Sequence, residues 1–459
     1  MNRKKRMRLK LAVLTGMCFG LLLCGVFFLD SPAMAACTGS SPSWTSTPDV
    51  ASVSTCVSSA ATGDTINVSA GTATWNSTLS ISKNISLIGA GIGNTNITVT
   101  TSPAIVWSLV NNSTLARVSG FTFNLNGSNC GMSVSGSVVA VASKLDRIRI
   151  DHNRFTNTSC LSPKGTLDFQ SVWGVVDHNT IDTVRVVWRT WGSGTGAPNW
   201  SAWGDINLGT DQTLWFEDNT ISTNGLYMVA DCDLAGRWSA RYNSFGGSTP
   251  SPWLDWHGWT SSGNQGCFGG EIYGNTYGSG GRMVSHRGGR AAIFFNQSAG
   301  ATYNVYDNNG CPGDTRQKIN NTYVWNNRNG MTGARSDWES SGGDNCGTAV
   351  VENGTFWIDG SNASGEGVTV GVGSGTLAAR SATCTSGVGY WATTQSVTDL
   401  TGMTGPNPST PISGTLYKCT GNAWTAYYTP YTYPHPLTSI SITSTDVTPP
   451  SPPQNLRVQ

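Results

Sequence analysis

The hexapeptide Ile150-Asp151-His152-Asn153-Arg154-Phe155 returns 26 residues later as Val176-Asp177-His178-Asn179-Thr180-Ile181. Looser copies of this turn, in which an asparagine follows a short apolar strand, centre on Asn219, Asn243, Asn275, Asn308, Asn327 and Asn353. Successive asparagines are 26, 40, 24, 32, 33, 19 and 26 residues apart. A solenoid whose rungs take about 20 residues, with loops inserted in some rungs, explains this spacing.

The repeated asparagine has a physical reason. It tolerates left-handed backbone angles at a tight corner, and its side-chain amide can bond to the equivalent amide one rung away. The strand before it alternates apolar and polar positions, as burial of one face requires. A β-sandwich or propeller would instead give hairpin signals and a more regular spacing. We therefore predict an all-β chain folded as a parallel β-helix, stabilised by disulfides.

The first rungs carry a resemblance to a known group of proteins. Gly63-Asp64-Thr65-Ile66 and Ala70-Gly71 precede a strand that ends in Ile88-Gly89-Ala90-Gly91. This order resembles the opening of the pectate-lyase-like superfamily of right-handed, single-stranded parallel β-helices, the pectin lyase fold. The resemblance covers roughly residues 55–360 and implies the fold. It leaves the activity open, because the superfamily includes lyases, hydrolases and binding proteins.

Residues 1–36 have the pattern of a signal peptide. A basic head, Lys4 to Lys10, precedes an apolar run from Leu11 to Leu29, and small residues suit cleavage after Ala35 or Ala36. An uncleaved membrane anchor is the alternative. Removing six basic residues and one acidic residue leaves 21 Lys+Arg against 25 Asp+Glu, a net charge of −4. We expect a secreted or cell-surface monomer with no transmembrane segment after signal removal and no affinity for nucleic acid.

Ten cysteines follow the signal segment, an even number that suits disulfides in an exported protein. A solenoid stacks residues that lie one rung apart, so pairing between sequence neighbours is the simplest arrangement. The predicted pairs are Cys37–Cys56, Cys130–Cys160, Cys232–Cys267, Cys311–Cys346 and Cys384–Cys419. No Cys-x-x-Cys spacing supports a zinc site instead.

The β-helix domain is predicted to cover residues 37–437. Its last part, 361–437, loses the asparagine repeat and is rich in proline and aromatic residues, which suits final irregular rungs and a cap over the open end. Residues 438–459 read as a proline-rich linker. They also resemble the lead-in to a fibronectin type III module and stop within its first strand.

Counting from the turn asparagines brings chemically active residues into one column. Asp231 and Asp233 lie 12 and 14 residues after Asn219, and the same offsets from Asn243 give Asp255 and His257. The offset of 12 from Asn275 gives Arg287, with His286 one position earlier and Arg290 nearby. Residues two apart in a strand share a side. We therefore expect Asp231, Asp255 and Arg287 to stack on one outward face.

The same region is rich in tryptophan. Aromatic surfaces beside carboxylates suit stacking against the apolar faces of sugar rings. The predicted substrate-binding residues are Trp238, Trp253, Trp256, Trp259 and His286. The alternative is that these tryptophans pack the loops against the wall of the helix. His152 and His178 recur in phase with the turn, which indicates a structural role.

Three functions can use these residues. By the resemblance to pectate lyases, Asp231, Asp233 and Asp255 would bind calcium, and Arg287 or Arg290 would be the base of a polysaccharide lyase. His257-Gly258 resembles part of the polygalacturonase pattern, which makes His257 and Asp255 catalytic candidates for hydrolysis. A glycoside hydrolase would instead pair Asp231 or Asp233 with Asp255 as acid and base or nucleophile. The third reading is a non-catalytic β-helix that binds carbohydrate or acts as an adhesin. Each takes a polysaccharide as partner.

Overall fold

The computed structural model describes one compact unit of the chain. Its described residues are 36–439 without 128, 140–142, 159, 161–164, 184–186, 192–206, 224–227, 248–252, 259–265, 279–280, 301, 307–317, 331, 337, 342–349 and 361–363. The predicted signal segment up to Ala35 and the linker from residue 440 onward therefore lie outside the described residues. In the part of the chain that the structure covers, no helix is long and apolar enough to cross a membrane.

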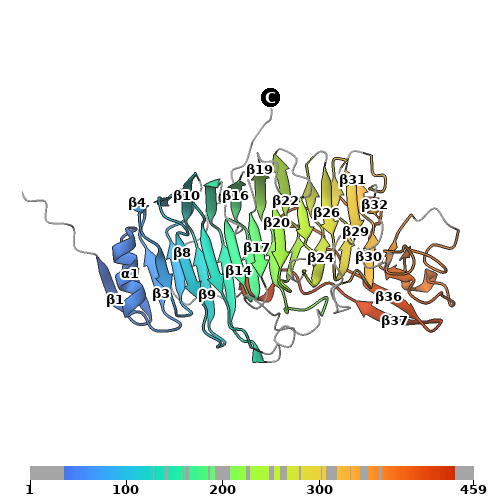
Figure 1. Cartoon of the computed structure of the whole chain (residues 1–459), viewed down its shortest axis with the longest axis horizontal. Coiled ribbons are helices and arrows are strands. Elements are labelled where there is room, and N and C mark those ends of the chain that lie inside the picture. The colour runs from blue at the N-terminus through green and yellow to red at the C-terminus, as the bar shows by residue number, and fades with distance from the viewer. Residues whose placement is uncertain are drawn as a thin grey trace, which may run out of the picture. The chain divides into compact units, whose positions relative to one another are not determined.

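From β3 to β32, successive strands pass in turn to three parallel sheets, which we name A, B and C, so each of these rungs contributes one strand to each sheet (Figure 1). This confirms the predicted all-β fold, a parallel β-helix. All the pairings in sheet A are parallel except the first, between β1 and β2. Sheet A consists of β1 (Cys37–Ser40), β2 (Ser43–Ser46), β3 (Thr65–Val68), β6 (Ser86–Gly89), β9 (Leu115–Ser119), β12 (Arg147–Asp151), β15 (Gly174–Asp177), β18 (Leu214–Glu217), β21 (Trp238–Arg241), β24 (Gly269–Tyr273), β27 (Arg290–Phe294), β30 (Thr322–Trp325) and β33 (Phe356–Ile358).

Sheets B and C follow the same order along the helix. Sheet B consists of β4 (Gly71–Trp75), β7 (Thr95–Val99), β10 (Thr122–Gly127), β13 (Arg154–Thr158), β16 (Thr180–Thr183), β19 (Thr220–Thr223), β22 (Ser244–Gly247), β25 (Thr276–Tyr277), β28 (Gln297–Ser298) and β31 (Arg328–Asn329). Sheet C consists of β5 (Leu79–Ile81), β8 (Ile105–Ser108), β11 (Met132–Ser135), β14 (Leu167–Gln170), β17 (Trp188–Trp191), β20 (Ala230–Asp233), β23 (Leu254–Trp256), β26 (Arg282–His286), β29 (Thr302–Tyr306) and β32 (Trp338–Ser341).

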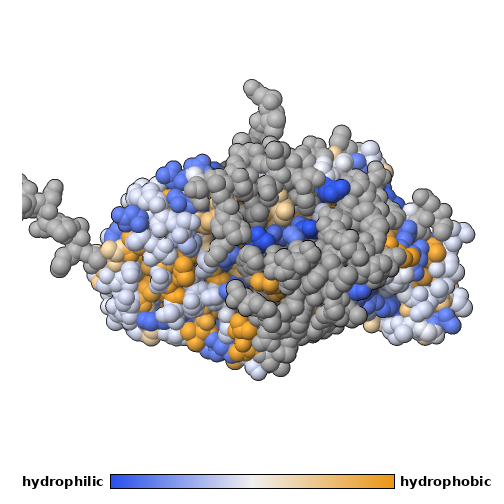
Figure 2. Space-filling model, in the orientation of Figure 1, coloured by the Kyte–Doolittle hydropathy of each residue, from blue (hydrophilic) through white to orange (hydrophobic). Residues whose placement is uncertain are grey.

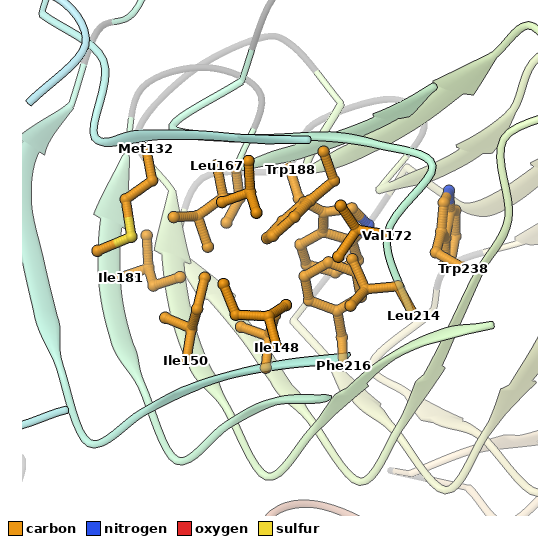
Figure 3. Packing of buried hydrophobic residues seen from close by; sticks show 14 of the residues in the cluster. Met132, Ile148, Ile150, Leu167, Val172, Ile181, Trp188, Leu214, Phe216 and Trp238 are labelled. Carbon is orange, nitrogen blue, oxygen red and sulfur yellow. The ribbon is translucent and has the colours of Figure 1, made fainter. Parts of the chain in front are cut away.

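Inward-facing side chains from the three sheets fill the interior with aliphatic and aromatic groups (Figure 3). Trp188 stacks on Phe216 with ring centroids 4.0 Å apart, and both rings are buried. At the N-terminal end, α1 (Val50–Ser59) buries Val53, Cys56 and Val57 against the same core. Its N-cap is Asp49, whose carboxylate accepts a hydrogen bond from the Ser52 amide at 2.9 Å.

A ladder of asparagines connects the rungs at the corner between sheets A and B. From the second member onward, the Oδ1 atom accepts hydrogen bonds from both the backbone amide and the side-chain Nδ2 of the preceding member, at 2.9–3.2 Å. In the first member, Asn153, Oδ1 accepts from the Phe121 amide at 3.1 Å. Nδ2 also donates to backbone carbonyls of its own and the previous rung. The members are Asn153, Asn179, Asn219, Asn243, Asn275, Asn296 and Asn327.

The structure corrects the prediction in two respects. The left-handed conformation falls on the residue before each asparagine, for example His152 at φ 51° and His178 at φ 54°, and the asparagine supplies only hydrogen bonds. The member between Asn275 and Asn327 is Asn296, where the sequence analysis proposed Asn308, which lies outside the described residues. Asn353 lies beyond the ladder and accepts a bond from the Gly371 amide.

Neighbouring cysteines pair as predicted wherever both partners are described. The bonds are Cys37–Cys56, Cys130–Cys160, Cys232–Cys267 and Cys384–Cys419. Cys311 and Cys346 lie outside the described residues. The four bonds suit an extracellular protein.

The C-terminal part forms more than the predicted cap. A small sheet, the end sheet, contains β34 (Val372–Gly375), β35 (Gly389–Ala392), β36 (Thr415–Thr420) and β37 (Ala423–Tyr428). The short 3₁₀ helices are η3 (Leu377–Ala379) and η4 (Pro436–Ser439). After β37 the chain turns back along the outer face of sheet A, and we call residues 429–439 the strap.

Buried polar groups of sheet A hold the strap. Arg241 pairs with Glu217 at 2.6 Å and donates to the backbone carbonyls of Tyr431 and Thr432 at 2.7 and 2.8 Å. Farther along, Glu217 accepts a bond from the His435 amide. The Arg149 guanidinium donates to the Thr438 carbonyl at 3.2 Å. The strap therefore runs from β21 back to β12, opposite to the order of the rungs in the sequence.

Glu271 fastens the chain at the end of β37, where the strap begins. One of its carboxyl oxygens accepts from the Tyr428 hydroxyl at 2.5 Å and the other from the Gly209 amide at 2.8 Å. Complete burial raises the pKa of Glu271 to about 7. The hydrogen bonds from Tyr428 and Gly209 and the charge of Arg241 oppose this rise in the pKa, so burial is what favours the protonated carboxyl.

Replacing Asn243 with alanine tests the ladder. The change removes the acceptor for the Asn219 amide and the donor to the Phe216 carbonyl, and unpaired buried groups cost about 1–3 kcal/mol each. We expect the free energy of unfolding to fall by about 3 kcal/mol or more, measured by urea denaturation. Asn94→Ala, at an exposed turn, is the control and should change little. Equal effects of the two substitutions would show that the ladder contributes nothing special.

Glu271→Gln tests the strap. A carboxyl whose pKa is raised from its usual value to about 7 binds its proton more tightly when folded. Stability should therefore decrease as pH rises from about 4.5 to 8, by up to about 3 kcal/mol. The glutamine variant should lose this part of the pH dependence in thermal melts. A wild-type pH profile in the variant would exclude Glu271 as its source.

Candidate functional site

A column of charged side chains follows the outer face of sheet C. Asp168 of β14 lies beside Arg189 of β17, and Arg189 lies beside Asp231 of β20. The registered pair Ala230 and Leu254 places Asp255 of β23 next to Asp231. Their flanking residues point into the core, which confirms that strand alternation turns the charged residues outward.

Four groups converge at one end of this column, and we call Asp231, Asp255, His257 and Arg287 the sheet C cluster. Arg287 donates two hydrogen bonds to Asp255. Nε donates to Oδ1 at 2.8 Å, and Nη2 makes a short contact with Oδ2. The same Nη2 lies 2.8 Å from His257 Nδ1. Nδ1 is also 3.5 Å from Asp231 Oδ1 and 3.9 Å from Asp255 Oδ2. Arg189 Nη2 lies 3.2 Å from the other oxygen of Asp231.

The two carboxylates are deep and the two other groups reach the surface. The side chains of Asp231 and Asp255 are 5% and 2% exposed, whereas those of Arg287 and His257 are 12% and 23% exposed. A bidentate contact with a buried carboxylate holds the guanidinium in its charged form. A substrate at this surface would therefore meet the imidazole and the guanidinium first.

Opposing influences set the protonation of His257 and Asp255. Burial lowers the pKa of His257 and the charge of Arg287 lowers it further, but the contact with Asp231 and the negative charges of Asp231 and Asp255 outweigh both and raise the pKa above its usual value. Burial raises the pKa of Asp255, against the opposing effect of Arg287 and with a further contribution from Asp231. His257 is thus an acid–base group balanced between a cation and two anions.

A disulfide fixes this arrangement. Cys232 follows Asp231 in β20 and is bonded to Cys267. The Cys267 amide donates to the His257 carbonyl at 2.7 Å. The chain that leaves the sheet at His257 is therefore anchored where it returns, beside Asp231, which restricts the position of the imidazole.

Arg287 reaches the cluster by a different route from the predicted one. Asp255 is registered with Ser285, not with Arg287, because the rung after Asn275 reaches sheet C two residues sooner than the rung before it. Arg287 follows the end of β26, and its long side chain extends back to Asp255. The prediction that these residues meet is right, and the predicted register is wrong by two residues.

The positions of Arg290 and Asp233 do not test the roles predicted for them. Arg290 begins β27 in sheet A. The pKa of Lys418 is lowered first by the burial of Lys418 and then by the positive charge of Arg290. Asp233 ends β20, and its side chain lies outside the described part of the structure. The roles predicted for these two residues, as base and as metal ligand, stay predictions.

The predicted aromatic surface is largely core. Trp238, Trp253 and Trp256 are completely buried, so these indoles have no face to offer a sugar ring. Trp238 and Trp256 pack on each other with centroids 5.0 Å apart. Trp259 lies outside the described residues. The interior of the helix is thus wide enough for tryptophan, contrary to the reasoning that placed these residues at the surface.

His286 is also a core residue. Its ring packs edge-on against Trp256, and Nε2 lies 3.0 Å from the Thr322 hydroxyl. Burial lowers the pKa of His286 to about 3, so the imidazole is neutral at physiological pH. It faces inward at the end of β26, just before the outward-facing Arg287, which excludes the predicted contact with substrate.

Sequence reasoning missed Arg189 and Asp168. Both are outward residues of sheet C between buried neighbours, as Asp255 is between Leu254 and Trp256. A lone charge inside an otherwise apolar strand is the signal that finds them. Counting a fixed number of residues from the turn asparagines could not find Arg189 and Asp168, because the loops before β14 and β17 differ in length from those of the later rungs.

A second acidic group lies on sheet A and has a structural role. Asp151, His152 and Asp177 bring their ligand atoms within 4.8 Å of one another. Arg117 holds Asp151 at 2.7 Å and Arg149 holds Asp177 at 2.9 Å, each through two nitrogens. The His152 ring stacks on that of His178 at 5.0 Å, which agrees with the predicted structural role of both histidines.

The calcium ion implied by the resemblance does not suit the described side chains of the sheet C cluster. Calcium takes 6–8 oxygen ligands. Here Asp231, Asp255 and His257 offer two carboxylates and a nitrogen within 4.8 Å. Arg287 engages both oxygens of Asp255, and Arg189 engages Asp231. Positive charge at this site comes from arginine, and no step below involves a metal ion.

Neither family models, nor curated proteins, nor solved structures gave a match to this chain. The geometry of the site therefore carries the functional argument alone.

Replacing Arg287 with leucine tests the central ion pair. The variant leaves Asp255 buried without its bidentate partner, so the free energy of unfolding should fall by about 3 kcal/mol. Adding Asp255→Asn should restore most of the loss, as measured by urea denaturation. Arg154→Leu, which breaks an exposed pair with Asp182, is the control and should change stability by less than about 1 kcal/mol. A double variant no more stable than Arg287→Leu would contradict the assignment.

Proposed function

We propose that this chain is an exported carbohydrate-active protein that cleaves an acidic polysaccharide by β-elimination. The observation that supports the proposal is the position of His257, half-buried between the Asp231 and Asp255 carboxylates and in contact with the Arg287 guanidinium. β-Elimination needs a base for the proton next to a uronate carboxylate and a cation beside that carboxylate. The cluster contains one group of each kind at its exposed rim.

The roles follow from competition for His257 Nδ1. In the free protein Arg287 Nη2 lies 2.8 Å from Nδ1, an arrangement in which the imidazole accepts and carries its proton on Nε2. A uronate carboxylate that takes this N–H from Arg287 would leave Nδ1 without a donor. Nδ1 could then take up a proton from solvent and donate it to Asp231, while Nε2 releases its own proton to solvent. Nε2 would then be unprotonated and able to act as the base. Arg287 keeps its ion pair with Asp255 throughout.

These groups can supply every proton transfer that the β-elimination needs. Nε2 takes the proton from the carbon next to the carboxylate, the bond to the glycosidic oxygen breaks, and a carbon–carbon double bond forms. The departing oxygen needs a proton, and the imidazolium just formed is the nearest donor in the cluster. Histidine rather than arginine is thus the proposed base, since the ion pair with Asp255 keeps Arg287 charged.

A glycoside hydrolase is the second candidate. Asp231 and Asp255 are neighbouring carboxyl groups, and burial raises the pKa of Asp255, as a general acid requires. The bidentate contact with Arg287 opposes this role, because it favours the ionised form of Asp255. A non-catalytic protein that only binds carbohydrate is the third candidate, and an assay would distinguish it from the two enzymes by the absence of products.

The test is a panel of pectate, alginate, hyaluronan and neutral glycans, assayed with and without chelator. We expect ultraviolet absorbance from an unsaturated uronate on an acidic glycan, unaffected by chelator. His257→Ala should lower kcat by at least about 100-fold. New reducing ends without that absorbance would establish hydrolysis, and binding without products would establish a non-catalytic protein.

His152→Ala supplies the matched control. His152 also contacts an aspartate through Nδ1, at 2.8 Å, and is 32% exposed, but it lies on sheet A. It should retain wild-type turnover. Equal losses in the two histidine variants would point to a general effect on folding and would remove the support for His257 as the base.

A further inference from the structure

A cavity of about 440 Å³ lies where the last rungs meet the end sheet, away from the sheet C cluster. Asn326 and Arg328 of the final ladder rung contribute one wall, and Ser374 of β34 and Tyr390 of β35 contribute another. Thr398 completes the rim. The volume of the cavity falls in the range of about 300–1,000 Å³ that is typical of small-molecule sites.

Two arginines and two acids line this cavity, and their ion pairs are loose. Arg335 lies 3.5 Å from Asp359 and 3.3 Å from Glu366. Arg328 is 3.9 Å from Asp359. Elsewhere in the same protein, Arg117 contacts Asp151 at 2.7 Å, the usual length of a charge-assisted hydrogen bond. A ligand carboxylate can therefore compete with the two acids for Arg335 and for Arg328, whose Nε stays bonded to the Val397 carbonyl at 2.9 Å.

The acids are held by other donors and do not depend on the arginines. Asp359 accepts from the Asn326 amide at 3.0 Å, and Glu366 accepts from the Gly360 amide at 2.8 Å. Arg335 is 48% exposed, which leaves its side chain room to turn toward a ligand. Hydroxyl groups at Ser374 and Thr398 and the Asn326 amide add neutral partners.

We propose that this cavity binds one anionic sugar unit, with its carboxylate on Arg335 and Arg328 and its hydroxyls toward Ser374 and Thr398. A cavity of this size lined by both charged and hydroxyl groups matches a ring that bears one carboxylate and several hydroxyls. The choice of a sugar acid rests on the proposed function, whereas an anion site in this place does not. The cavity would then hold a second part of an acidic glycan, or its free end.

Proton binding should be coupled to occupancy. Burial raises the pKa of Asp359 to about 6, against the effect of the Asn326 amide and of Arg335 and Arg328. The other charged group at this carboxylate is Glu366, which raises the pKa further. A ligand carboxylate drawn to the arginines adds negative charge beside Asp359 and favours its protonation. Affinity should therefore fall several-fold as pH rises from about 5.5 to 7.5.

The experiment is calorimetric titration of the whole chain with D-galacturonate, which has no glycosidic bond to cleave. Arg335→Leu should weaken binding at least tenfold. Arg154→Leu is a matched control, because Arg154 is also 48% exposed and pairs with an aspartate at 3.3 Å. Asp359→Asn should tighten binding at pH 7.5 and remove the pH dependence, an opposite effect that a loss of folding cannot imitate.

The outcomes separate this proposal from the proposed function. His257→Ala should leave galacturonate binding at the cavity unchanged, and Arg335→Leu should leave turnover of short substrates unchanged. No binding of galacturonate, or equal binding by wild type and Arg335→Leu, would overturn the cavity site. Glucose or acetate that binds as tightly as galacturonate would overturn its assignment to a sugar acid.

Discussion

The asparagine ladder is the interaction on which the rest of this structure depends. From the second member onward, each side-chain oxygen accepts two hydrogen bonds from the rung before it, so the corner between sheets A and B cannot slip by one residue without breaking several buried bonds at once. A fixed corner fixes the register of the strands that follow. Because register decides which residues stack, the ladder indirectly determines which charges lie next to one another on the outer faces.

The two outer faces use stacked charges differently. On sheet A the acids and arginines pair closely and are covered by the strap, with Arg241 fully buried beneath Tyr431 and Tyr433. On sheet C, Arg287 and His257 stay partly exposed. The face shown in Figure 2 mixes hydrophilic, intermediate and hydrophobic residues over the N-terminal rungs. Among the described residues, large hydrophobic side chains with high exposure are scattered, as at Val110 and Leu377.

Sequence alone was sufficient for the fold and for part of the site. The turn asparagines and the alternation of the strands predicted the β-helix and the outward positions of Asp231 and Asp255. The meeting of Asp255 with Arg287 was predicted through a register that was two residues off, since loop lengths vary between rungs. Asn296 was missed, although Phe295 takes the left-handed position before it as Tyr242 does before Asn243, because Asn308 follows a similar strand later in the same interval. Burial of Trp238 and Trp256 could not be predicted, because the width of the interior is a property of all three sheets together.

The strap has a mechanical consequence. Its fastenings lie in a row, from Glu271 through Arg241 and Glu217 to Arg149, and the one nearest residue 439 is at Arg149 in the middle of the helix. Tension applied beyond residue 439 would reach the Thr438–Arg149 contact first and then each earlier contact in turn. The contacts of the strap would break one after another, while the rungs beneath keep their own hydrogen bonds. The β-helix is thereby shielded from a pull on its C-terminal side until the whole strap has come away.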